Sequence, residues 1–188
     1  MILPGNFFAA LPCIAAAALA FPASASAEVF NGPYAGAEAG IGVVKTKGST
    51  FAGPFKDSDS SVITGAVIGY RLPLGDDSPI VLGAEGNAGI YADGTDARYG
   101  ISGIGGVRIG EKALVYLRGG YGWLDGVQTG AGKGVDGAVI GGGAEFGITD
   151  AISIRADYKY LDYGGVDFPD NTLDFKGHEI TAGLLFNF

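Results

Sequence analysis

The chain of 188 residues is acidic, because it carries 12 Lys and Arg against 20 Asp and Glu, for a formal net charge of −8. It has no basic stripe, which argues against nucleic-acid binding. A hydrophobic fraction of 47% with 9 Tyr and 11 Phe excludes a disordered chain, and 35 glycines without a three-residue period exclude collagen.

Residues 1–27 have the pattern of a cleaved export signal. They contain no charged side chain, the stretch from Phe7 to Phe21 is apolar, and 23–27 reads Ala-Ser-Ala-Ser-Ala. We expect cleavage after Ala27, which leaves 28–188 as one domain. The alternatives are a retained anchor, for which about 15 apolar residues are short against the roughly 20 needed, and lipidation at Cys13, which Pro12 disfavours. The single cysteine lies in this signal, so 28–188 can form no disulfide.

Eight segments of residues 28–188 alternate between apolar and polar side chains with a period of two. In chain order they span 34–44, 61–72, 80–91, 99–109, 114–124, 135–148, 151–161 and 178–188. Within 151–161, Ile154 and Ala156 fall on one face and Arg155 on the other, because successive side chains of a strand point to opposite faces. Each segment has about ten residues, the length of a transmembrane β-strand.

The connections between these segments alternate in length. Short ones follow the second, fourth and sixth segments (73–79, 110–113 and 149–150), longer ones follow the first, fifth and seventh (45–60, 125–134 and 162–177), and 92–98 is intermediate. Bacterial outer-membrane barrels combine short periplasmic turns with longer extracellular loops. The sequence therefore predicts an all-β protein: an eight-stranded antiparallel transmembrane β-barrel over 28–188, in the cell outer membrane.

Residue size indicates which face of the barrel points inward. The face with the charged residues also carries the glycines, whereas the opposite face carries the bulky Tyr, Trp, Phe, Leu and Ile residues. An eight-stranded barrel has an interior just wide enough to be filled by side chains, so large residues on every inward position would overpack it. We expect the apolar face to contact lipid and the charged face to line the lumen.

The inward positions carry ionisable residues of balanced sign, which we interpret as a lumen charge network. These are the acids Glu38, Glu85, Glu145, Asp157 and Glu179 and the bases Arg71, Arg108, Arg118, Arg155 and Lys159. Buried charges persist only when they are paired, so we expect pairs between neighbouring strands, such as Arg71 with Glu85 and Arg155 with Glu145 or Glu179. A gated ion path is the alternative reading.

Aromatic residues near the segment ends predict girdles at both membrane interfaces. The periplasmic set is Tyr34, Tyr70, Phe146, Phe186 and Phe188, and the outer set is Tyr91, Tyr99, Tyr121, Trp123, Tyr158 and Tyr160.

Three stretches carry a resemblance to a known family: 117–123 (LRGGYGW), 155–164 (RADYKYLDYG) and the last segment, which ends in Phe186 and Phe188 at alternate positions. The chain resembles small outer-membrane barrels of the opacity-protein and OmpA-membrane-domain type, and most of all the porin-family surface proteins of alphaproteobacteria. The resemblance implies that Phe186 and Phe188 form a C-terminal signal for the outer-membrane assembly machinery.

No catalytic, cofactor or metal site is predicted, and we do not expect an enzyme. The single histidine, His178, has the acid Glu179 on the opposite face, so no triad forms. The glycine runs 103–106 and 141–143 lie within strand patterns and precede no helix. Asp57 and Asp59 lack the rest of a calcium loop, and the acidic stretch 162–174 reads as a solvated loop.

Two functions remain open. The first is a structural surface protein with a lumen plugged by side chains, which supports membrane integrity and displays loops to host or surface ligands. The alternative is a narrow porin-like channel for small ions or solutes. In both, the expected partners are outer-membrane lipid, lipopolysaccharide and the assembly machinery.

Overall fold

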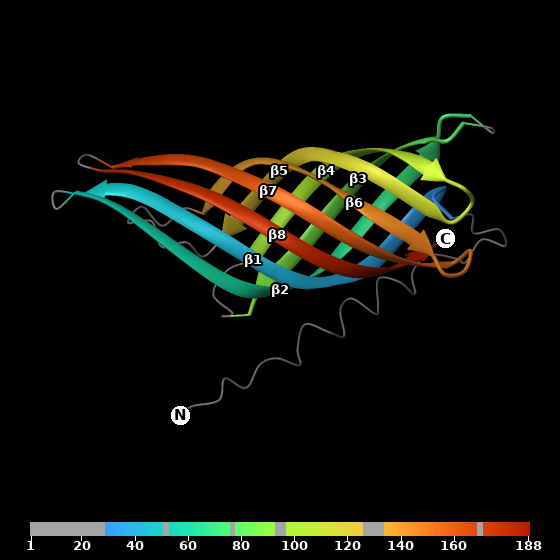
Figure 1. The fold of residues 1–188 in the computed structure, drawn as a ribbon, viewed down its shortest axis with the longest axis horizontal. Helices are drawn as coiled ribbons and strands as arrows, with labels where there is room; N and C mark the ends of the chain where they lie inside the picture. Colours follow the sequence, from blue (N-terminus) through green and yellow to red (C-terminus); the bar gives the residue numbers. More distant parts are fainter. Residues whose placement is uncertain (1–28, 51–52, 76–77, 93–96, 126–133, 169–170) are drawn as a thin grey trace, which may run out of the picture.

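The computed structural model describes residues 29–50, 53–75, 78–92, 97–125, 134–168 and 171–188. Its strands are β1 (Gly32–Thr50), β2 (Gly53–Pro73), β3 (Ile80–Tyr91), β4 (Ala97–Ile109), β5 (Ala113–Asp125), β6 (Val135–Gly147), β7 (Ile152–Phe168) and β8 (Asn171–Asn187). Each pairs antiparallel with the next, and β1 pairs with β8, which closes the barrel (Figure 1). The predicted all-β barrel is confirmed.

The predicted signal segment, residues 1–27, lies outside the described residues. Within the described part of the chain, no helix is long and apolar enough to cross a membrane.

Strand β4 shows how the period of two becomes two faces. Arg98, Ser102 and Ile104 are buried inside the barrel, whereas Tyr99 and Ile101 between them are exposed on its outside. Closure gives the backbone groups of this strand partners on both sides, from β3 and β5. A lipid environment requires that closure, because it offers no water to an open sheet edge.

The barrel is inside-out relative to a soluble protein. Leu117 is 74% and Ile180 66% exposed on the outer surface, whereas Glu38 and Arg155 are 4% and 3% exposed inside. Apolar surface of this extent matches a hydrocarbon environment and not water. The assignment of faces from residue size is therefore confirmed.

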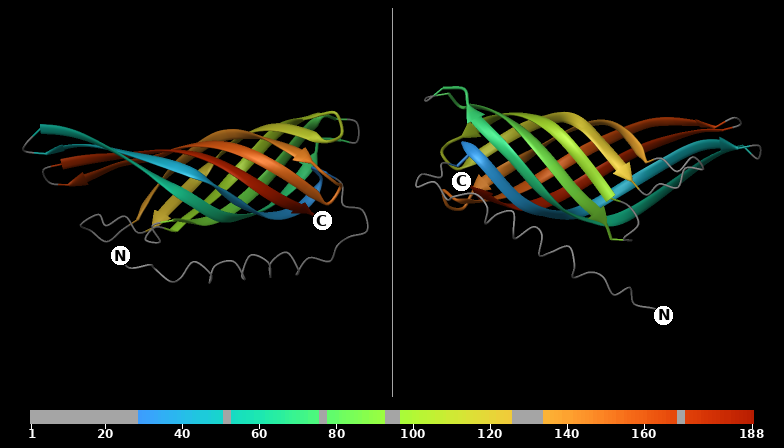
Figure 2. Two further views of the ribbon diagram at one scale, coloured as in Figure 1. Left: turned by 60° about the horizontal axis from the view of Figure 1, so that its bottom comes forward. Right: turned by 180° about the vertical axis from the view of Figure 1, so that it is seen from behind.

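Two of the predicted long loops are largely strand, which corrects the sequence-based boundaries. β1 continues to Thr50 and β2 begins at Gly53, and β7 continues to Phe168 and β8 begins at Asn171. β1 also pairs with β8 out to Gly48. The order β2-β1-β8-β7 thus forms a four-stranded sheet that projects past the other strands (Figures 1 and 2). Residues 45–60 and 162–177 lose the apolar alternation, yet backbone pairing continues because it needs no apolar face in water.

The end of the barrel opposite this projecting sheet holds the short turns. Residues 148–151 connect β6 to β7 there, with the Ile148 amide donating to the Ile152 carbonyl at 2.8 Å. The chain ends at the same side (Figure 2), where the Phe188 amide donates to the Pro33 carbonyl at 3.0 Å. This is the arrangement expected of a barrel with both termini in the periplasm.

Candidate functional site in the barrel lumen

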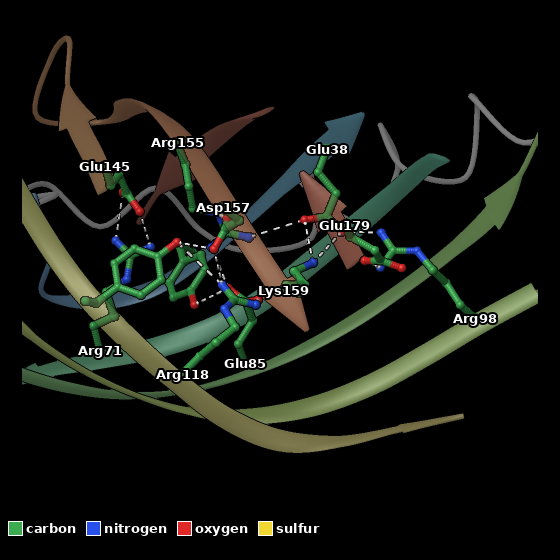
Figure 3. Close-up of polar contacts among 12 residues, drawn as sticks. Glu38, Arg71, Glu85, Arg98, Arg118, Glu145, Arg155, Asp157, Lys159 and Glu179 are labelled. Atoms are coloured by element: carbon green, nitrogen blue, oxygen red, sulfur yellow. Dashed lines mark hydrogen bonds and ion pairs between the residues drawn. The ribbon is translucent and has the colours of Figure 1, made fainter. Parts of the chain in front are cut away.

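Among the residues that the structure describes, ten acidic and basic side chains, each at most 4% exposed, lie inside the barrel. They are the acids Glu38, Glu85, Glu145, Asp157 and Glu179 and the bases Arg71, Arg98, Arg118, Arg155 and Lys159 (Figure 3). Their formal charges cancel. The structure places nine of the ten residues proposed from the sequence in this set, and the tenth member is Arg98 instead of Arg108.

At the end with the short turns, Arg71 holds Glu145 through two parallel bonds. Arg71 Nη1 donates to Glu145 Oε1 at 2.9 Å and Nη2 donates to Oε2 at 2.6 Å. The Ser153 hydroxyl also donates to Glu145 Oε1 at 2.5 Å. The guanidinium carbon lies 3.8 Å from the centre of the Tyr34 ring. Two-point binding together with a ring contact fixes the Arg71 head group in one orientation.

In the middle of the lumen, two arginines and two acids interlock. Glu85 accepts from Arg118 Nη1 at 2.8 Å and from Arg155 Nη1 at 2.5 Å. Asp157 lies 2.9 Å from Arg118 Nη2 and 2.7 Å from Arg155 Nε. Each arginine therefore contacts both acids, and each acid contacts both arginines.

Toward the projecting sheet, Arg98 bridges Glu38 and Glu179. Its Nη2 donates to Glu38 Oε1 at 2.6 Å and its Nη1 to Glu179 Oε2 at 2.7 Å. Lys159 Nζ donates to Glu38 Oε1 at 3.1 Å. The contact between Arg155 Nη2 and Glu38 Oε2, at 3.6 Å, links this group to the middle one.

The acids take further hydrogen bonds from tyrosine hydroxyls inside the barrel. Tyr34 donates to Glu85 at 2.8 Å, Tyr91 to Glu179 at 3.1 Å and Tyr116 to Asp157 at 2.6 Å. Glycine makes room for one of these rings, since a Cβ added at Gly69 would lie 2.6 Å from Tyr34 Cε1.

The pairing expected between neighbouring strands is wrong. Arg71 on β2 pairs with Glu145 on β6, and Arg155 on β7 pairs with Glu85 on β3. In the backbone register, Arg155 stands directly opposite Glu145, yet its head group crosses the lumen instead. The long side chains reach across a narrow interior, and the sequence alone does not show which residues face each other across it.

Arg108 does not join the network, which corrects its assignment. It has the inward parity but lies half-buried at the turn end of β4, where its Nη2 donates to the Ser78 carbonyl at 2.7 Å. Arg98, one residue before the predicted start of that strand at Tyr99, was missed. Its spacing from the inward-facing Ser102 could have identified it, because residues separated by four positions share a face of a strand.

Tyr34 and Tyr91 are not part of the lipid-facing girdles. Tyr34 is 1% and Tyr91 5% exposed, and both point into the lumen. The sequence could have shown this, because residues an even number of positions apart share a face of a strand: Tyr34 shares one with Glu38, and Tyr91 with Glu85. The remaining girdle aromatics that are exposed on the outside are Tyr70, Tyr99, Tyr121, Trp123, Phe146, Tyr158 and Phe186.

Apolar clusters border the charged groups at both ends. Near the turns, Val29 and Phe30 pack with Val81, Ile104, Leu114 and Tyr116. Near the projecting sheet, the cluster is Ile63, Tyr91, Leu124, Val135, Val139, Leu161 and Tyr163. A small cavity lies between the second cluster and the network. It is lined by polar residues, among them Asn87, Arg98, Ser102 and Lys159, and by apolar ones, among them Val139 and Leu161.

His178 lies outside the lumen, on the face that carries Ile180. Its Nδ1 is 2.8 Å from the Tyr158 hydroxyl, and its ring centre is 5.2 Å from that of Tyr160. The described residues contain no group of three His, Cys, Asp or Glu side chains arranged for a metal ion. The glycine runs 103–106 and 141–143 lie within β4 and β6.

The model of the protein family "Outer membrane protein beta-barrel domain" matches residues 13–188 of this chain. The 25 kDa outer-membrane immunogenic protein of Brucella ovis is 31% identical over 170 residues, which are 82% of this chain and 77% of that protein. Its counterpart in Brucella melitensis is 30% identical over 176 residues, with 82% and 78% covered. Among solved structures, Neisserial surface protein A shares 16% identity with a TM-score of 0.52, over 84% of this chain and 98% of the other.

Proposed function

The chain belongs to the family of outer-membrane proteins with a β-barrel domain, and on that premise we propose that it is a structural surface protein whose lumen is closed by its own side chains. It strengthens the outer membrane as a rigid barrel and presents its projecting sheet to the surroundings of the cell. The observation that carries this proposal is the charge network, because its ion pairs span the lumen from wall to wall.

The pairs Arg71–Glu145 and Arg155–Glu85 each join strands on opposite sides of the barrel. A solute that passes must break such pairs in a space shielded from water, and a separated buried charge costs several kcal/mol. The cancelling charges leave no excess of one sign to attract ions of the other. This supports a filled interior rather than a selective pore.

Phe30 supports closure at the periplasmic end. Its side chain is fully buried, and its ring centre lies 5.9 Å from the Arg71 guanidinium carbon. Its backbone has a φ of 69°, which non-glycine residues rarely adopt. Such a conformation persists when the surrounding packing holds it, as the cluster with Val29 and Leu114 does here.

The surface role rests on the four-stranded projection at the end opposite both described chain termini. β1–β2 and β7–β8 extend past their neighbours there (Figure 2). The Brucella relatives carry the description "immunogenic", and we infer that the corresponding surface of this chain is accessible from outside the cell. Host or other surface ligands would meet this sheet first.

The narrow channel is the second candidate, favoured by the small cavity that Asn87, Ser102 and Lys159 line together with apolar residues. Single-channel recording in planar bilayers separates the two functions. We expect no resolved conductance from the folded protein, with an open porin inserted at equal density as the control. Steady conductance steps from the folded protein would replace the closed barrel with the channel.

A further inference from the structure

Two lysines of neighbouring strands stand opposite each other on the outer surface of the barrel. Lys45 on β1 is the register partner of Lys176 on β8, and both occupy the face that carries Ile41 and Ile180. Register partners in an antiparallel sheet have Cβ atoms roughly 5 Å apart, and like charges so placed destabilise the sheet. This pair is notable because the chain as a whole has a net charge of −8.

The pair lies where the apolar surface ends. Ile41 and Ile180, two same-face steps nearer the middle of the barrel, are 58% and 66% exposed. Between them and the lysines stand Val43 and His178. His178 contacts Tyr158 and Tyr160, and aromatic side chains of this kind collect at the membrane–water interface. The ammonium groups therefore lie at the level of lipid head groups.

The nearby acid does not neutralise both lysines. Asp162 Oδ2 lies 3.5 Å from Lys176 Nζ, longer than the roughly 2.8 Å of a close charge-assisted hydrogen bond. Both partners are more than two-fifths exposed. No ion pair of Lys45 occurs among the described residues. Lys176 also hydrogen-bonds to the Tyr160 hydroxyl. Among the side chains that the structure describes around the pair, one acid stands against two bases, which leaves one positive charge in excess.

We propose that Lys45 and Lys176 bind a phosphate group of an outer-leaflet glycolipid. A phosphate between the two ammonium groups removes their repulsion, and its sugar lies against the Tyr160 and His178 rings. Glycolipid is the occupant because this face borders the hydrocarbon at the end with the projecting sheet, where the outer leaflet carries phosphorylated lipopolysaccharide. The site is independent of whether the lumen conducts.

Binding is measured by calorimetric titration of the folded protein in detergent with purified lipopolysaccharide. Each lysine near an anionic lipid surface contributes roughly fivefold in affinity, so the double variant Lys45→Gln and Lys176→Gln should bind about twenty-five-fold more weakly. Lys45→Arg should retain binding, and Lys112→Gln, at an exposed turn of the opposite end, should bind like the wild type.

Chemically dephosphorylated lipopolysaccharide should bind the wild type as weakly as intact lipopolysaccharide binds the double variant. Millimolar inorganic phosphate should not compete. Equal affinity of the two glycolipids, or full competition by inorganic phosphate, would overturn the proposal. So would a change of oligomeric state in the double variant with unchanged glycolipid affinity, which would assign this surface to a second copy of the chain.

A thermal measurement provides a second readout that does not depend on binding heats. Without glycolipid, Lys45→Gln should raise the melting temperature, because it removes the repulsion with Lys176. With saturating lipopolysaccharide the order should reverse, because the wild type gains more from the ligand. If Lys45→Gln shifts the melting temperature in the same direction under both conditions, the site does not exist.

Discussion

At the scale of single residues, the lumen depends on a few arginines that each serve several acids. Arg155 contacts Glu85, Asp157 and Glu38, and it is 3% exposed. Its removal would leave these carboxylates with fewer compensating charges. The overall balance of charge contributes more to stability here than any single pair, because water cannot solvate a buried carboxylate that has lost its base.

Replacing Arg155 with Ala should therefore lower the free energy of unfolding by about 3–5 kcal/mol. Urea unfolding from lipid vesicles, followed by the shift of the folded band on gels, measures the change. Arg108→Ala is the matched control, since Arg108 is half-buried at a turn and donates to a backbone carbonyl. Equal losses in the two variants would show that the network contributes no more to stability than a turn contact.

The lipid-facing surface makes a separate prediction at the same scale. Leu117, 74% exposed on β5, should tolerate Met but not Lys. A lysine near the middle of the bilayer destabilises a barrel by about 2–4 kcal/mol, because its charge leaves water. Glu111→Lys, in the exposed turn before β5, should change little. Similar unfolding free energies for Leu117→Lys and Leu117→Met would place this face away from lipid.

At the scale of elements, the strand cores could be predicted because lipid and lumen impose opposite demands on alternate residues. Tyr99 and Ile101 face out while Ser102 faces in, and no helix would arrange them so. The extensions of β1, β2, β7 and β8 could not be predicted, because the apolar alternation stops there. In the part of the β2 extension whose side chains are described, from Asp57 to Ser60, successive residues on both faces are exposed. The partners of Arg71 and Arg155 could not be predicted either. The alternation along a strand shows whether a side chain points inward, but not which residue it meets across the barrel.

The end of β8 carries a prediction of its own. Phe186 is exposed on the lipid face, and the Phe188 amide bonds back to Pro33 at the start of β1. We propose that Phe186 and Phe188 form the signal that the assembly machinery reads. Deleting Phe188 should leave precursor or periplasmic aggregate, with little folded, heat-modifiable protein in outer-membrane fractions.

Refolding in vitro separates assembly from stability in that experiment. The truncated chain should still fold into lipid vesicles, because most of the β1–β8 ladder, from Tyr34 opposite Asn187 outward, remains. Normal outer-membrane insertion of the truncated chain in cells would refute the signal.

At the scale of the whole molecule, the barrel combines three layers along its axis. An apolar cluster with Phe30 lies at the turn end, balanced ion pairs fill the middle, and a second apolar cluster with Tyr163 lies toward the projecting sheet. An interior of eight strands is about as wide as the side chains it holds, whereas open porins have about 16 strands. The proposed closure of the lumen rests on these layers together rather than on any one of them.

Liposome swelling tests this closure most directly. Liposomes that contain the pure, folded protein are diluted into iso-osmotic solutions of small sugars, and the optical density is followed, with an open porin at equal density as the positive control. We predict no swelling above that of protein-free liposomes. Rapid swelling with the wild-type protein would contradict the closed lumen and establish the channel in its place.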